Sequence, residues 1–210
     1  KHPGYRAKQI WQWLFREHAT DFAAMTNLPA ELREQLGNSF IIGRLAILRR
    51  HDSEDGTVKL LFGLADGQSI ESVIIPEKHR LTLCISTQVG CAYGCAFCAT
   101  ALLGFKRNLT CGEIVEQILE ANRILTGDRL ITNVVLMGMG EPLANYAQTL
   151  RAIEIMVDAA WGLRIAPRKI TLSSVGLVPQ IQKLMEETNV TLAISLHAAT
   201  EELRGRLMPV

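Results

Sequence analysis

The stretch LTLCISTQVGCAYGCAFCATALLG, residues 81–104, joins an apolar strand pattern directly to a loop rich in cysteine and small residues. The apolar and β-branched residues at 81–87 predict a buried strand. The loop that follows holds Cys91, Cys95 and Cys98 with the spacing C-x3-C-x2-C, and no fourth cysteine completes the set nearby. We therefore expect a bound group at the end of this strand, held by three thiolates and left with one open position.

Three more apolar strand patterns follow residues 81–87, and amphipathic helix patterns separate them. The strands are expected at 131–138, 168–174 and 190–197, and the helices at about 111–126, 145–159 and 178–188. Strands of this kind that alternate with helices indicate a parallel sheet with right-handed crossovers. Four strands do not close a barrel, so the pattern predicts an open sheet or part of a barrel.

Residues that could take part in catalysis or ligand binding lie at the predicted carboxyl ends of these strands. MGMGEP (137–142) ends the second strand, Ser173 and Ser174 end the third, and Ser195-Leu196-His197 ends the fourth. In parallel α/β folds this edge of the sheet carries the active site. The common location is stronger evidence for a site than any one of these motifs alone.

The first part of the chain has a different pattern. YRAKQIWQWLFREH predicts an amphipathic helix, and NLPAELREQLG predicts a second helix that begins at Pro29 and stops at Gly37. Short strand patterns then alternate with Asp55-Gly56 and Asp66-Gly67, which are hairpin-turn signals. We expect a helical N-terminal accessory domain, a β-rich extension and a core domain, at residues 1–45, 46–78 and 79–210.

Composition limits the class of protein. The chain has 210 residues, 48% hydrophobic and 20% charged, which favours a globular core over disorder. No apolar run reaches the length of a membrane span, so we expect a cytoplasmic protein without a membrane partner, in which thiols stay reduced. The net charge of +1 gives no overall nucleic-acid signature. Residues 1–50 carry 8 Lys and Arg against 4 Asp and Glu, a modest basic excess.

Two kinds of group suit the three cysteines. Zinc would need a fourth ligand, which Cys84 or Cys111 could supply, and the protein would then be a zinc-stabilised RNA-binding module. A [4Fe–4S] cluster held by three cysteines instead leaves one iron open to chelate a small molecule. The small residues between the cysteines suit close approach of the backbone to a cluster. An aromatic residue just before the third cysteine could wall the site against solvent and flank a purine.

The cysteine motif, with its aromatic residue and its place after the first strand, resembles the radical S-adenosylmethionine (SAM) superfamily. Over most of the chain the sequence is also similar to the RlmN/Cfr-type RNA adenine methyltransferases, on the pattern IPE…R.TLC.STQVGC…C.FCATA..GF.RNLT followed by NVV.MGMGEPL.N. The resemblance implies an α/β fold, a partial (β/α) radical-SAM barrel preceded by a small helical domain and a short β-hairpin extension. It implies one [4Fe–4S] cluster and SAM as cofactors.

The resemblance also implies roles for individual residues. Three cysteines would ligate the cluster: Cys91, Cys95 and Cys98. Six residues would bind SAM: Gly140, Glu141, Ser173, Ser195, Leu196 and His197. Two would act in catalysis, Glu71 as a proton acceptor and Cys84 as a thiol that resolves a protein–RNA adduct. The sequence departs from the family pattern at Val175, where a small polar residue is expected.

The implied reaction is methylation of C2 of an adenine in 23S ribosomal RNA and in transfer RNA. In such a relay, one SAM methylates a cysteine near the C-terminus and a second SAM yields a radical on that methyl group, which adds to the base. Cys84 would end in a disulfide with the relay cysteine, which we expect beyond Val210 in a longer protein. A flavodoxin-type protein is the expected electron donor. C8 methylation of adenine and radical chemistry on a small molecule are the alternatives.

Overall fold

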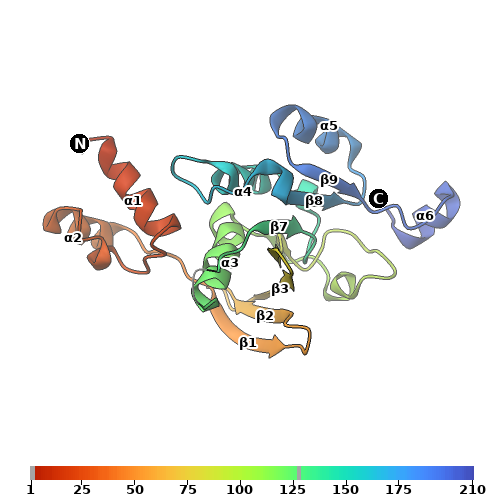
Figure 1. Ribbon diagram of the computed structural model, residues 1–210. Coiled ribbons are helices and arrows are strands. Elements are labelled where there is room, and N and C mark those ends of the chain that lie inside the picture. The colour runs from red at the N-terminus through yellow and green to blue at the C-terminus, as the bar shows by residue number, and fades with distance from the viewer. Residues whose placement is uncertain (1–2, 127–128) are drawn as a thin grey trace.

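The computed structural model describes residues 3–126 and 129–210 (Figure 1). Its main sheet has seven strands in the order β1-β2-β3-β4-β7-β8-β9 within the described residues. Their bounds are β1 (Ala46–Asp52), β2 (Val58–Gly63), β3 (Ser69–Glu77), β4 (Arg80–Cys84), β7 (Asn133–Leu136), β8 (Ile170–Ser174) and β9 (Thr191–Ile194). The α/β fold class predicted from the alternating pattern is confirmed.

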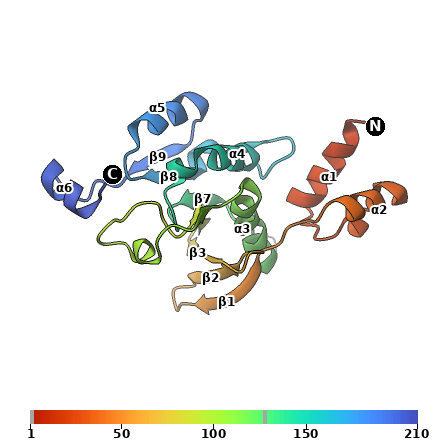
Figure 2. The same cartoon turned by 180° about the vertical axis from the view of Figure 1, so that it is seen from behind.

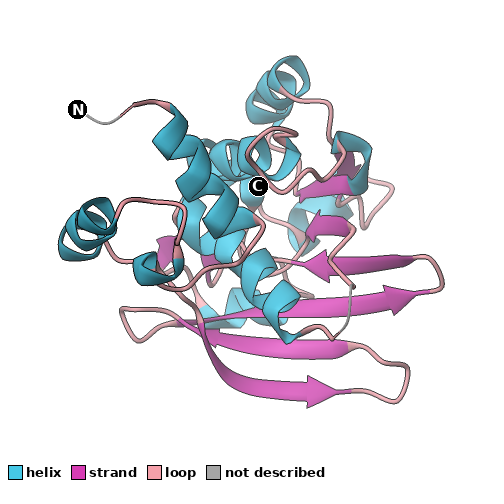
Figure 3. Cartoon of the chain, turned by 60° about the vertical axis from the view of Figure 1, so that its left-hand side comes forward, coloured by secondary structure: helices cyan, strands magenta, loops and turns pink. Residues whose placement is uncertain are grey.

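The sheet has an antiparallel part and a parallel part. Strands β1 to β4 pair antiparallel, and β4, β7, β8 and β9 pair parallel. Both hairpin signals form turns, with Gly56 at φ +82° and Gly67 at φ +81°. Because β3 pairs with β4 through Val73 and Cys84, the strands within residues 46–78 extend the same sheet. Figure 3 shows this antiparallel part as the longer arrows of the sheet.

Helices cover one face of the parallel part of the sheet. They are α3 (Cys111–Ile124), α4 (Tyr146–Val157) and α5 (Val178–Glu187). Strand β8 shows the effect of this cover, since Ile170, Leu172 and Ser174 are buried while Thr171 and Ser173 are only half-buried. Alternate residues of a strand point to opposite faces. The sheet therefore has a packed face against the helices and a second, more open face.

The N-terminal residues form a small helical unit with its own hydrophobic cluster. It contains α1 (Tyr5–Phe15), the short helix η1 (Phe22–Ala24) and α2 (Ala30–Ser39). Its buried residues are Ala19, Met25, Leu28 and Leu32. The predicted stop of the second helix at Gly37 is wrong. A side chain there would meet nothing within 4 Å, and the helix continues until Phe40 becomes extended.

Several short elements were not predicted from the sequence. Those around the cysteine loop and after β9 are β5 (Gln88–Val89), β6 (Arg107–Asn108), η2 (Ala99–Leu103) and α6 (Glu201–Leu207). Strands β5 and β6 pair antiparallel and close the loop that holds the cysteines. Figures 1 and 2 place this loop and α6 on one side of the molecule and the helical unit on the other. None of the helices within the described residues is long and apolar enough to cross a membrane.

Candidate functional site

The cysteine loop is closed at its base by a tight backbone contact. Gly90 follows β5 with φ +73°, and a Cβ there would lie 1.7 Å from the carbonyl oxygen of Gly104. The N–H of Lys106 donates to the carbonyl of Val89 at 3.0 Å, beside the β5–β6 pair. Glycine is required at position 90 because the two ends of the loop touch, and the contact gives the cysteine loop a fixed base.

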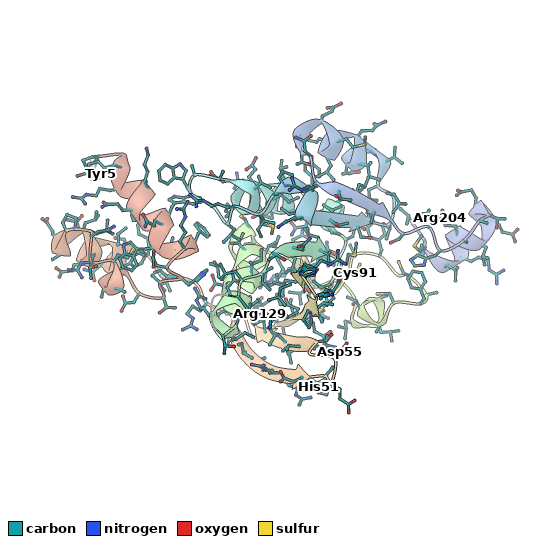
Figure 4. All side chains as sticks on the ribbon, in the orientation of Figure 1. Tyr5, His51, Asp55, Cys91, Arg129 and Arg204 are labelled. Carbon is teal, nitrogen blue, oxygen red and sulfur yellow. The ribbon has the colours of Figure 1, made fainter. Side chains whose placement is uncertain are left out.

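The three motif cysteines lie within this loop as free thiols. Cys95 is buried, and Cys91 and Cys98 are half-buried. The N–H of Tyr93 donates to Cys91 Sγ at 3.4 Å. Cys95 and Cys98 border a hollow of about 450 Å³ that is lined by residues of the loop itself. Figure 4 shows Cys91 between the strands and the side of the molecule where α6 lies.

The donor set at the loop fits an iron–sulfur cluster with an open position. Burial raises the pKa of Cys91 and of Cys95, and the charge of the neighbouring thiols raises both further. Within residues 3–126 and 129–210, no three metal-binding side chains already converge on one point. Cys84 and Cys111 lie outside the loop, in β4 and at the start of α3. Three thiols carried by one loop match a cluster with three protein ligands.

The turn after β7 is built around a buried carboxylate. Glu141 is 3% exposed, and its two oxygens accept the backbone N–H groups of Leu143 at 3.1 Å and Val175 at 2.9 Å. Burial raises the pKa of Glu141, and these hydrogen bonds offset part of the shift. Val175 contributes its backbone here, so its departure from the family pattern does not remove the contact. Each oxygen keeps a further lone pair for a ligand.

The ends of β8 and β9 meet the cysteine loop at the same edge. Ser173 Oγ and Ser195 Oγ are 3.5 Å apart. The ring of His197, a residue with φ +55°, lies 4.2 Å from the ring of Phe97 between centroids, which brings the loop against the end of β9. Leu196 is 65% exposed and points to no partner in the core. The residues expected to bind SAM at the ends of β8 and β9 therefore lie beside the loop that carries the three cysteines.

Glu71 and Cys84 lie on the open face of the sheet, near one another. Val73 pairs with Cys84 across β3 and β4, which makes Glu71 the diagonal neighbour of Cys84 on the same face. Glu71 Oε1 forms an ion pair with Lys59 Nζ at 2.8 Å, and both side chains are partly exposed. Burial raises the pKa of Cys84, and a backbone hydrogen bond from Met137 partly offsets the shift. Cys84 is therefore a thiol at neutral pH.

Sequence reasoning missed two residues that connect these loops. Gln88 in β5 is buried and hydrogen-bonds to both the cysteine loop and the β7 turn. Arg204 in α6 donates to the carbonyl of Val175, and to the carbonyl of Ser195 at 3.4 Å. Gln88 lies inside the STQVGC motif, but no spacing rule predicts which residues it hydrogen-bonds. Nothing in the sequence around Arg204 signals its two acceptors.

Arg107 is held within the fold by two carboxylates. Its guanidinium forms ion pairs with Asp66 at 2.6 Å and with Glu113 at 2.8 Å. The hydrogen bonds that Arg107 donates to Glu113 and Asp66 raise the pKa of Arg107 above its ordinary value. Arg107 thus ties the β2–β3 turn to the start of α3. Its neighbour Lys106 is exposed.

Two family models match this chain. The model described as Radical SAM superfamily matches residues 85–209. The model described as Ribosomal RNA large subunit methyltransferase N-terminal domain matches residues 2–42. The first match spans the cysteine loop and the ends of β7, β8 and β9, and the second spans the helical unit.

The chain is also similar to curated proteins and to a solved structure. It is 52% identical over 206 residues to the dual-specificity RNA methyltransferase RlmN of Desulfosudis oleivorans, covering 98% of this chain and 56% of that protein. It is 49% identical over 206 residues to RlmN of Geobacter sulfurreducens, with the same two coverages. A crystal structure of a radical SAM methyltransferase from Sphaerobacter thermophilus superposes with a TM-score of 0.92 at 46% identity, covering 99% of this chain and 61% of that one. The chain thus spans somewhat more than half the length of these relatives.

Proposed function

We propose that this chain, which belongs to the radical SAM superfamily, forms the cofactor-binding core of an RNA methyltransferase that modifies C2 of adenine. One observation carries the proposal: the three-cysteine loop, the Glu141 turn and the ends of β8 and β9 meet at one edge of the sheet. The similarity to RlmN proteins over 98% of the chain supports RNA as the substrate class. C2 as the position is taken from the family resemblance of the sequence motifs.

Different residues of the site would bind the two cofactors. Cys91, Cys95 and Cys98 would bind three irons of a [4Fe–4S] cluster, which leaves the fourth iron for SAM. The bound cluster supplies the electron that cleaves SAM to a radical able to abstract hydrogen. The β7 turn would bind the SAM amino group through Gly140 and Glu141, whose carboxylate oxygens have free lone pairs. The residues that end β8 and β9, Ser173 and Ser195-Leu196-His197, would bind the rest of SAM.

The open face of the sheet would present the remaining chemical groups to the base. Glu71 is proposed as a proton acceptor, held in place by its ion pair with Lys59. Cys84 is proposed as the thiol that resolves the protein–RNA adduct. Its sulfur would form a disulfide with the relay cysteine as the bond between that cysteine's sulfur and the transferred carbon breaks, and the electron pair of that bond would stay with the methylated base. Cys84 is free in the described chain, where all five cysteines are thiols. Its raised pKa means that it needs a proton acceptor before it can attack, and Glu71 is its diagonal neighbour.

Substrates and partners of the whole protein are part of the same proposal. The substrates would be 23S ribosomal RNA and transfer RNA, in agreement with the word dual-specificity in the names of the relatives. Residues 1–45 would form an accessory domain that helps to grip RNA, residues 46–78 an extension, and residues 79–210 the core. A flavodoxin-type protein would supply electrons, and the reaction would take place in the cytoplasm.

The test uses the complete product of the gene that encodes this chain. The reconstituted protein is incubated with SAM, a reductant and 23S ribosomal RNA that lacks the modification, and the nucleosides are analysed by mass spectrometry. We expect 2-methyladenosine. Formation of 8-methyladenosine alone would assign the protein to C8 methylation. Formation of 5′-deoxyadenosine without any methylated adenosine in ribosomal or transfer RNA would contradict RNA as the substrate.

A further inference from the structure

Gln88 is a buried residue to which the proposed reaction assigns no role. It lies in β5 at the base of the cysteine loop and is 1% exposed. Its Oε1 accepts the N–H of Ala92 at 3.2 Å, within the cysteine loop, and the N–H of Glu141 at 3.0 Å, within the β7 turn. Its Nε2 donates to Asn108 Oδ1 at 2.8 Å, in β6. One carboxamide therefore contacts three separate segments of the site.

Gly140 provides a second, independent contact between Gln88 and the β7 turn. Gly140 has φ +98°, and a Cβ at this position would lie 2.5 Å from Gln88 Cβ and 2.8 Å from the Gln88 backbone nitrogen. The turn thus packs directly on the Gln88 side chain. Glycine is needed at position 140 because Gln88 fills the space, whatever ligand the turn also binds.

We propose that Gln88 is a positioning residue that fixes the distance between the cysteine loop and the Gly140–Glu141 turn. Neither segment can move relative to the other without breaking a buried hydrogen bond to the same oxygen, and buried groups that lose their partners are costly. This inference rests on the proposed function, in which the loop holds the cluster and the turn holds the SAM amino group. Gln88 then sets how well the open iron and the amino group fit one SAM molecule.

The central test is Gln88→Leu, which keeps most of the side-chain volume and removes all three hydrogen bonds. The reconstituted protein is assayed for iron and sulfide, for SAM affinity by titration, and for the SAM-induced change in the electron paramagnetic resonance spectrum of the reduced cluster. We expect cluster content close to that of the wild type, because the three cysteines are intact. We expect SAM affinity to fall roughly 10- to 100-fold, the usual effect of losing a supporting residue around a metal site.

Gln88→Glu is the conservative variant that should rescue binding. Its carboxylate can accept both backbone N–H groups, and the Asn108 amide can rotate to donate to the second oxygen. We expect SAM affinity within a few-fold of the wild type and a restored spectral change. Should Gln88→Leu fail to fold, Asn108→Ala tests the same link more mildly, because it frees the Gln88 carboxamide to rotate. A weaker SAM affinity is then expected, and an unchanged one would contradict the inference.

Gln117 offers a matched control because it is a fully buried glutamine with several hydrogen bonds. Its Oε1 accepts from Ser72 Oγ and from the N–H of Ser86, both at 2.8 Å, and it links α3 to the sheet without contacting either loop. Gln117→Leu should lower thermal stability without weakening SAM binding. The inference is overturned if Gln117→Leu weakens SAM binding as much as Gln88→Leu, or if Gln88→Leu binds SAM like the wild type. A wild-type protein without a cluster or a SAM response would instead overturn the proposed function itself.

Discussion

The cysteine-loop edge and the junction between the helical unit and α3 are held together by different kinds of contact. At the loop edge, the buried side chains of Gln88 and Glu141 accept backbone N–H groups. At the junction, the buried carboxylate of Glu120 binds Arg44 at 2.9 Å and Arg123 at 2.7 Å. Buried side chains that accept backbone N–H groups fix the shape of the loops at the site. At the junction, charged side chains pair within α3 and with Arg44, which lies between α2 and β1.

The two regions should differ in what a mutation disturbs. Loss of a cysteine ligand or of the Gln88 hydrogen bonds at the loop edge should alter cofactor binding with little effect on global stability, and loss of the Glu120 carboxylate at the junction should do the reverse. Arg123 shows how the junction joins distant segments, since its Nε also donates to the carbonyl of His18 at 3.4 Å, and Arg16 Nη2 donates to the carbonyl of Ala160 at 2.8 Å.

Cys91→Ala should abolish the cluster. Loss of one of three protein ligands leaves two irons without a cysteine, so we expect almost no iron or sulfide after reconstitution. Metal analysis measures this. Cys111→Ala is the control, because Cys111 is also half-buried but lies at the start of α3 outside the loop. Equal loss of metal from both variants would show that Cys111 is a ligand and would contradict the assignment of the site.

Glu120→Ala should destabilise the fold without changing the cluster. The Glu120 side chain is 2% exposed, and its loss removes one of the two carboxylates that pair with Arg123, which keeps Glu116 at 2.5 Å. Losing a buried, hydrogen-bonded charge partner costs about 1.5–3 kcal/mol, and chemical denaturation measures the free energy of unfolding. Asp52→Ala removes an exposed ion pair with Arg50 and should have no measurable effect. A reduced iron content in the folded Glu120→Ala protein would show that the two regions are not separate.

Val175→Ser restores a small polar side chain at a position where the sequence departs from the family pattern. The backbone N–H of residue 175 still donates to Glu141, so we expect SAM affinity to stay close to that of the wild type. The buried valine packs beside Cys95 and Met208, and we expect its loss to cost about 1 kcal/mol of stability. Titration with SAM and thermal unfolding check both results. A large change in SAM affinity would mean that the side chain at 175 contacts the ligand.

The raised pKa of Cys84 predicts slow modification at neutral pH. A higher pKa leaves less thiolate at a given pH, so alkylation in the folded protein should be slower near pH 7 than in the unfolded chain. The alkylation rate of Cys84 should rise as the pH increases above the ordinary pKa of a thiol. Mass spectrometry of peptides after timed alkylation measures it. Equal rates for the folded and unfolded chain at pH 7 would show that Cys84 is not shielded as described.

The sequence predicted the parts of the fold that depend on nearby residues. The parallel strands, the hairpins at Asp55-Gly56 and Asp66-Gly67, and the cysteine loop follow from local spacing. The short β5–β6 pair was not predicted, because two-residue strands carry no periodicity. The antiparallel pairing of β3 with β4 was not predicted either. The end of α2 was missed because Gly37 lies in an exposed turn of the helix, where packing did not force a stop.

At the site, residue types were predictable and their partners were not. Clustered thiols and a glycine-rich turn mark a ligand site in any sequence, and their place at strand ends located it. The contact between Glu141 and Val175 joins residues 34 positions apart, and that between Gln88 and Glu141 joins residues 53 positions apart. Such pairs depend on how the strands order themselves in the sheet, which a single sequence does not specify. For this reason the sequence indicated a ligand-binding role for Gly140 but not its contact with Gln88.

Metal and sulfide content after anaerobic purification and reconstitution tests the central claim most directly. We expect about four irons and four sulfides per chain, with no need for Cys84 or Cys111 as ligands. About one zinc per chain without sulfide would contradict it, because the three thiols would then belong to a structural zinc site completed by one of those two cysteines.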